Sequence, residues 1–200
     1  PGAQALRSVL GFTFRHWARR RGQALWIAVT IALATMTEIF MPLYAGRLID
    51  ALGRGEAARE AALHAFAAMA GLGVLMIVLR HLAWAGVVPF TLGIMQDVGR
   101  DVFHRVQRLS TDWHANSFSG SVVRKITRGM WALDTIDDVL LLALWPSAVV
   151  LVGTMVLLGL HWPAMGAVMA IGTLAYIALT VSVAARLLAP AARLSNAWDT

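Results

Sequence analysis

Four stretches of this chain are each long and apolar enough to cross a lipid bilayer, and that feature constrains the fold most. A helix needs roughly 20 predominantly apolar residues to span the hydrocarbon core. The stretches lie at 24–46, 62–87, 139–160 and 162–185, and the last two contain no charged residue. A soluble helical bundle, the alternative, would carry amphipathic stripes in place of continuous apolar runs. The sequence therefore predicts an all-α membrane protein with four spans.

The basic residues of the chain collect near the ends of these stretches. The formal net charge of +6 would by itself also suit a nucleic-acid-binding protein. The arginines, however, gather before residue 22 and within 88–138 rather than along one face. Positive residues favour the cytoplasmic side of a membrane. We therefore expect no nucleic-acid partner, both chain ends and the 88–138 segment in the cytoplasm, and the two short connections outside.

Residues 1–22 interleave apolar side chains with arginines, which predicts an amphipathic elbow helix ahead of the first span. Such a helix would lie in the cytoplasmic interface, with its aromatic residues at the headgroup boundary. A disordered tail with scattered apolar residues is the alternative. The remaining residues, 23–200, are expected to form one transmembrane domain.

The segment 88–138, between the second and third stretches, has almost no turn residues except near its middle. Val98, Val102 and Val106 repeat every four residues beside charged residues, which predicts an amphipathic continuation of the second span. Ser, Thr, Asp and Asn then gather within 109–119 and Gly120 follows, so this part interrupts the helix. We expect two cytoplasmic helices of about 35 Å each, joined by a short transverse helix near 111–118.

The order of these features resembles the transmembrane domain of ABC exporters. Residues 42–52, Pro-Leu-Tyr-Ala-Gly-Arg-Leu-Ile-Asp-Ala-Leu, are similar to that family's exit from its first helix. Its first intracellular loop is resembled by residues 100–109, with Phe103 among them, followed by Trp113 and Gly120. The resemblance covers essentially the whole chain, but only four of the family's six spans. The residues at 130–134, Met-Trp-Ala-Leu-Asp, depart from the family's more usual polar run and leave the cargo open.

The resemblance implies the amino-terminal part of a half-transporter in the cytoplasmic (inner) membrane. Its expected partners are the lipid bilayer, a second half-transporter of the same or another sequence, nucleotide-binding domains and an unidentified transported substrate. ATP and Mg would bind in those domains, because no Gly-x-x-x-x-Gly-Lys-Ser/Thr loop occurs here and Lys125 is the only lysine. The complete transporter would hydrolyse ATP, while these residues are expected to hold no cofactor and no catalytic residue.

By the same resemblance, residues 111–118 would form a coupling helix that rests on a nucleotide-binding domain. The candidate coupling residues are Asp112, Trp113, His114, Asn116 and Phe118. Aromatic side chains near the centre of an interface often dominate its binding energy. The alternative is an exposed turn whose Trp113 and Phe118 pack against neighbouring helices.

Among the chargeable residues inside the predicted spans, Glu38 and Arg80 are the strongest candidates, because an ionisable side chain at membrane depth is a functional candidate by default. Glu38 could line a translocation cavity. Arg80 could line it too, although it could instead snorkel to the interface. An ion pair between the two is a further possibility. Because the chain has no cysteine and no His-x-x-x-His pair, we expect no metal site.

The predicted function is the membrane-spanning part of an ATP-driven ABC exporter, which forms the substrate path and transmits the motion of the ATP domains. The alternative is a self-contained four-span protein without enzymatic activity, such as a channel subunit, an assembly factor or a sensor. A membrane-integral enzyme is disfavoured, because the spans lack clustered His, Asp or Glu ligands.

Overall fold

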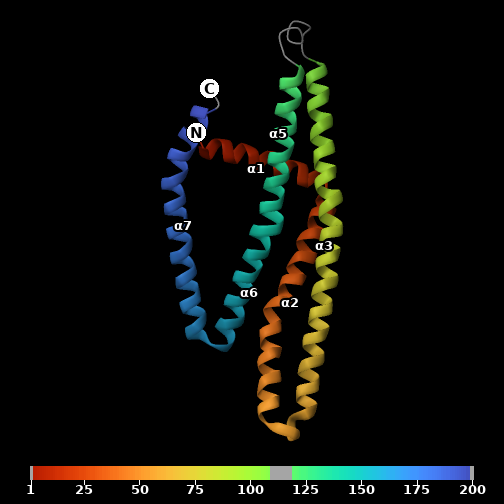
Figure 1. Cartoon of the computed structure of the whole chain (residues 1–200), viewed down its shortest axis with the longest axis vertical. Coiled ribbons are helices and arrows are strands. Elements are labelled where there is room, and N and C mark those ends of the chain that lie inside the picture. The colour runs from red at the N-terminus through yellow and green to blue at the C-terminus, as the bar shows by residue number, and fades with distance from the viewer. Residues whose placement is uncertain (1, 109–118, 199–200) are drawn as a thin grey trace. The chain divides into compact units, whose positions relative to one another are not determined.

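The computed structural model describes residues 2–108 and 119–198, and this part of the chain is helical with no strand. The predicted all-α class is therefore confirmed. The elements are α1 (Gly2–Arg19), α2 (Arg21–Gly53), the 3₁₀ turn η1 (Gly55–Ala58), α3 (Arg59–Gln107), α5 (Ser119–Asp138), the π-helical turn η2 (Val139–Leu144), α6 (Trp145–His161) and α7 (Pro163–Trp198) (Figure 1).

The helices form two units, residues 1–150 and residues 151–200. Four helical ranges are long and apolar enough to cross a membrane: Arg21–Gly53, Gly55–Gln107, Val123–His161 and Pro163–Ala184. The predicted stretches fall on these helices, apart from Trp162, which lies in the turn between α6 and α7.

The length of α3 requires that it leave the membrane. Its 49 residues extend about 73 Å at 1.5 Å per residue, whereas the hydrocarbon core is about 30 Å thick. The helix is continuous through Pro89, although proline removes one backbone donor there. More than half of α3 therefore lies outside the hydrocarbon core.

In the first unit, α2 and α3 form a long antiparallel hairpin and lie side by side (Figure 1). Gly55 begins the connection with a φ of +73°, a conformation that glycine adopts without the penalty of a Cβ atom. Because this turn is short, the two helices pack against each other along much of the length of α2.

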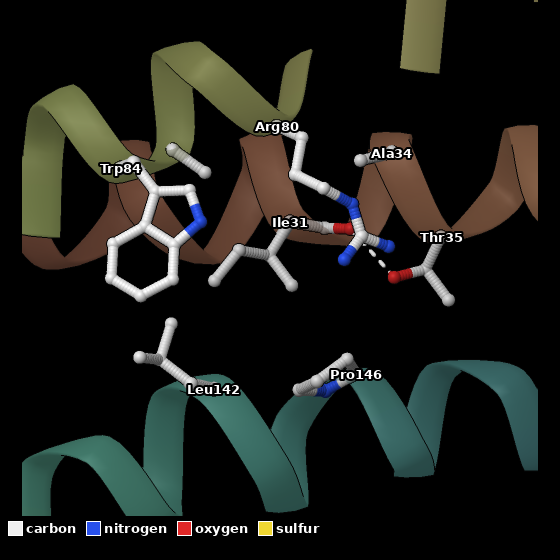
Figure 2. Close-up of a pocket in the computed structure, with 8 residues that line it drawn as sticks. Ile31, Ala34, Thr35, Arg80, Trp84, Leu142 and Pro146 are labelled. Atoms are coloured by element: carbon white, nitrogen blue, oxygen red, sulfur yellow. Dashed lines mark hydrogen bonds between the residues drawn. The ribbon is translucent and has the colours of Figure 1, made fainter. Parts of the chain in front are cut away.

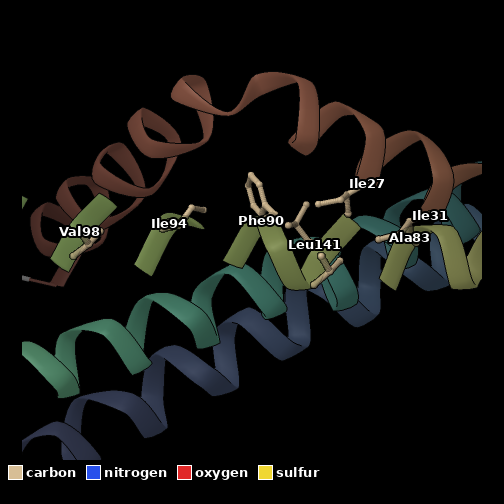
Figure 3. Packing of buried hydrophobic residues seen from close by; sticks show 8 residues of the cluster. Ile27, Ile31, Ala83, Phe90, Ile94, Val98 and Leu141 are labelled. Carbon is tan, nitrogen blue, oxygen red and sulfur yellow. The ribbon is translucent and has the colours of Figure 1, made fainter. Parts of the chain in front are cut away.

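A stripe of buried apolar side chains holds this unit together. Ile27 and Ile31 of α2 face α3, and Leu141 of η2 joins them (Figure 3). The α3 members recur at helical spacing: Ala83, Val87, Phe90, Ile94 and Val98. Phe90 and Ile27 are fully buried. The stripe passes without a break from the predicted span of α3 into the part of α3 beyond that span.

The π-helical turn η2 lies where α5 leads into α6. Pro146 has no N–H to donate to the carbonyl of Leu142, and its ring would collide with that carbonyl in a regular α-helix. The wider π-helical turn just before Pro146 relieves this conflict locally. The chain therefore has an irregular joint between α5 and its third predicted span.

The second unit is a helical hairpin made by the end of α6 and by α7. The N–H of Trp162 donates to the carbonyl of Leu158 at 2.6 Å, which closes the turn. A Cβ atom added to Gly166 would lie 2.8 Å from Cα of Gly159. The two glycines thus let the helix backbones touch beside the turn, as small residues commonly do in membranes.

Candidate functional site

A cavity of about 110 Å³ lies among α2, α3, η2 and α6, and every residue that lines it belongs to a predicted span. Figure 2 shows these side chains facing one another from three directions. The lining residues are Ile31, Ala34, Thr35, Arg80, Ala83, Trp84, Leu142 and Pro146. The lining is mostly apolar, but a guanidinium and a hydroxyl also face the cavity, which has room for several water molecules.

Arg80 forms an ion pair with Glu38, so α3 and α2 are joined by a charged contact beside this cavity. Of the alternatives that the sequence left open for these residues, the structure contains the pair. Pairing lowers the free-energy penalty of holding two charges at membrane depth. Arg80 lines the cavity, whereas Glu38 adjoins it through Arg80. Their role in a translocation path stays a prediction.

The threonines of α2 satisfy their hydroxyl groups within their own helix. Thr35 donates to the carbonyl of Ile31 at 2.8 Å, and Thr37 donates to Ala34 at 2.6 Å. The Thr35 oxygen then keeps a lone pair that a group inside the cavity can use as an acceptor. The cavity therefore offers a cationic donor from Arg80 and a neutral acceptor from Thr35.

The indole of Trp145 ties the third span to the first near the cavity. Its Nε1 donates to the carbonyl oxygen of Ala28 at 2.8 Å. Trp145 directly follows η2, so this bond holds the membrane side of the irregular joint. Sequence reasoning missed this contact, because nothing in the pattern of a span identifies a backbone acceptor on another helix.

A second indole, from Trp17 of α1, holds the α5 side of the same joint. Its Nε1 donates to Oδ1 of Asp137 at 2.9 Å, and the edge of its ring meets Phe90 with centroids 5.9 Å apart. Asp137 is only 2% exposed. The sequence predicted that α1 is amphipathic, but it did not predict that α1 packs on α3 and α5.

Two arginines fasten the end of α1 to the extension of α3. Arg20 Nε donates to Oδ2 of Asp97 at 2.9 Å, and Arg19 Nη1 donates to Oδ2 of Asp101 at 3.2 Å. The Arg20 guanidinium passes directly over Gly93, where a Cβ atom would overlap it. Asp97 and Asp101 are four residues apart on one helix face. Sequence analysis did not predict that this face binds the end of α1; the four-residue spacing was the only signal that could have suggested it.

The five candidate coupling residues lie outside the described residues. They are Asp112, Trp113, His114, Asn116 and Phe118. The structure does describe the helices on both sides of them, α3 ending at Gln107 and α5 beginning at Ser119. The coupling role of these residues stays a prediction.

The described residues hold no group of three or more His, Asp or Glu side chains that could bind a metal ion.

A family model for the ABC transporter transmembrane region matches residues 25–199. Searches of curated proteins and of solved structures found no match. The match covers most of the chain and includes the cavity, the Glu38–Arg80 pair and the π-helical joint. Together with four helices able to cross a membrane, it identifies a multi-pass membrane protein with a transport function. The chain belongs to the ABC transporter transmembrane region family.

Proposed function

We propose that this chain forms the substrate path of an ATP-driven exporter and passes the motion of nucleotide-binding domains into the membrane. The observation that carries the proposal is the length of α3, which continues as one helix far beyond a predicted span. Crossing the bilayer requires only about 20 of the 49 residues of α3. The extra turns are useful if something outside the bilayer pushes on them.

The extension of α3 is suited to act as a lever because its packing is continuous. The buried stripe runs from Ala83 in the predicted span to Val98 in the extension. Closely packed side chains transmit displacement, because interiors have few voids that could absorb it. A force applied near Gln107 would therefore displace the side chains at the other end of the stripe, near Ala83.

Cargo would contact the cavity between the first three spans. Arg80 and Thr35 supply polar contacts there, and Trp84 supplies an aromatic face. Glu38 holds the guanidinium in place from outside the lining. A cargo that pairs with either charge would compete with this ion pair, and it could thereby link occupancy to the packing of α2 on α3.

In this proposal, ATP and Mg bind to nucleotide-binding domains outside the residues 1–200, and a second half-transporter completes the path. The segment with Trp113 and Phe118 would contact those domains. Both chain ends and the α3–α5 arm would be cytoplasmic, with the protein in the cytoplasmic membrane. The Arg-rich segments on that side support this orientation.

The test uses the transporter assembled with its nucleotide-binding domains in liposomes. Because the chain has no cysteine, Leu25→Cys on α2 and Val123→Cys on α5 create unique sites for spin labels. We expect ATP with Mg to shift the distance between the labels. Trp113→Ala should abolish most of the shift without reducing membrane insertion, whereas Trp131→Ala, at an exposed position on α5, should leave it intact.

An unchanged label distance in the unsubstituted chain would contradict transmission of motion through this arm. A full shift in the Trp113→Ala variant would contradict the coupling role of the 111–118 segment. Solute flux through the liposomes without ATP would favour a channel instead.

A further inference from the structure

The π-helical joint is bracketed by two indole hydrogen bonds. Asp137, two residues before η2, accepts from Trp17 at 2.9 Å, and Trp145, directly after η2, donates to Ala28 at 2.8 Å. Both partners belong to the amino-terminal helices α1 and α2. Between the two bonds, Leu141 is inserted into the buried stripe and is 4% exposed (Figure 3). The joint is thus held on both sides and in its middle by the same part of the chain.

A π-helical turn is a weak point in a lever. Its backbone hydrogen bonds join residues five positions apart, one more than in an α-helix, and such turns are rare and mostly limited to a single turn. Pro146 has no N–H to donate to the carbonyl of Leu142, so a regular α-helix through the joint would lack one hydrogen bond. Without a brace, bending at η2 would absorb motion of α5 before it reached α6.

We propose that Trp17 and Trp145 are positioning residues that stiffen this joint, so that α5 and the start of α6 move as one body. The inference rests on the proposed function, because only a chain that transmits motion from α5 to α6 needs a stiff joint. The stiffening itself is a property of the chain that can be measured without ATP.

The two bonds differ in strength because their acceptors differ. Asp137 is a nearly buried carboxylate, and a hydrogen bond to a charged group is worth more than a neutral one. The carbonyl of Ala28 is neutral and can also accept within its own helix. Loss of the Trp17 bond should shift the population of the braced arrangement roughly 10- to 100-fold, and loss of the Trp145 bond roughly 2- to 10-fold.

Phenylalanine removes the N–H donor and keeps an aromatic ring. In the Trp17→Phe variant the ring can still pack on Phe90, so packing and hydrogen bonding are separated. Trp131→Phe is the matched control, because that side chain lies on α5 and is 64% exposed. Asp137→Asn keeps an acceptor for Trp17 but removes the charge, so it tests how much of the effect depends on the carboxylate.

The experiment measures the width of the distance distribution between spin labels at Val123→Cys and Val150→Cys in the assembled transporter, without nucleotide. We expect Trp17→Phe to broaden the distribution clearly and Trp145→Phe to broaden it less. Trp131→Phe should leave it narrow, and Asp137→Asn should broaden it less than Trp17→Phe does. Adding Pro146→Ala to Trp17→Phe should narrow it again, because alanine permits a regular helix through the joint.

A narrow distribution in both Trp17→Phe and Trp145→Phe would overturn the inference, whatever ATP does. If Trp17→Phe does not fold, the Trp145→Phe result decides the matter alone. With ATP and Mg, labels at Leu25→Cys and Val150→Cys then report the membrane side. If the joint is braced and the unsubstituted chain still shows no ATP-dependent shift, the proposed function fails and the brace stands.

Discussion

Replacing Gly93 with alanine tests whether the elbow helix is fastened to α3 by the Arg20–Asp97 contact. Gly93 and Gly99 lie on α3, six residues apart, and glycine in a helix costs about 0.5–1 kcal/mol relative to alanine. Nothing lies within 4 Å of a Cβ atom at Gly99, so Gly99→Ala should gain that stability in full. At Gly93, the added methyl group would occupy the space of the Arg20 guanidinium.

The magnitude follows from the contact that is lost. Arg20 is a flexible side chain that can move away, so the methyl group causes little strain, but the bond to Asp97 is broken. A hydrogen bond between charged groups contributes about 1.5–3 kcal/mol. The two side chains are 28% and 24% exposed, so we discount the value to about 1–2 kcal/mol. Gly93→Ala should therefore be about 1–2 kcal/mol less stable than Gly99→Ala.

The assay compares the free energies of unfolding of the two variants in detergent micelles by denaturant titration. The same pair is then measured with Arg20→Ala present, where the difference should vanish because no guanidinium remains to displace. Equal stability of the two glycine variants in the native background would refute the reasoning. A difference that persists without Arg20 would show that Gly93 is sensitive for another reason.

Three further outcomes are expected. Phe90→Ala should lower the free energy of unfolding by about 3–5 kcal/mol because Phe90 is fully buried, whereas Phe66→Ala, 61% exposed on the same helix, should change it little in denaturant titrations. Glu38→Ala or Arg80→Ala should each reduce thermal stability in detergent because one charge loses its partner, and the exchanged pair Glu38→Arg with Arg80→Glu should recover part of it; no recovery would argue against the ion pair. Gly166→Ala should lower the melting temperature because its methyl group meets the Gly159 backbone, whereas Gly172→Ala, with open space around it, should not.

The parts of the fold that follow from hydrophobicity and length could be predicted from the sequence. Continuous apolar runs identify membrane helices because water would otherwise contact too much apolar surface. The continuation of α3 beyond its predicted span was visible in the repeat of Val98, Val102 and Val106. These features depend on properties that are summed along many residues, so one atypical residue does not change the prediction of a helix.

The contacts between distant helices could not be predicted in the same way. Trp17 and Asp137 are 120 positions apart in the chain, and either residue alone suits many roles. A Glu38–Arg80 pair was one of the possibilities that the sequence left open. Whether the two side chains lie at the same depth in the membrane depends on the packing register of α2 on α3, which the sequence does not give. A register depends on the interdigitation of Ile27, Ala83 and Phe90, which periodicity does not specify.

The pairing of Glu38 with Arg80 also bears on the order in which the chain can be made. The two residues are separated by 42 positions, so a ribosome completes the first apolar stretch well before it adds the arginine. During that interval the carboxyl group has no cationic partner from the second stretch. The α2–α3 hairpin is therefore the smallest piece of nascent chain that contains both members of this ion pair.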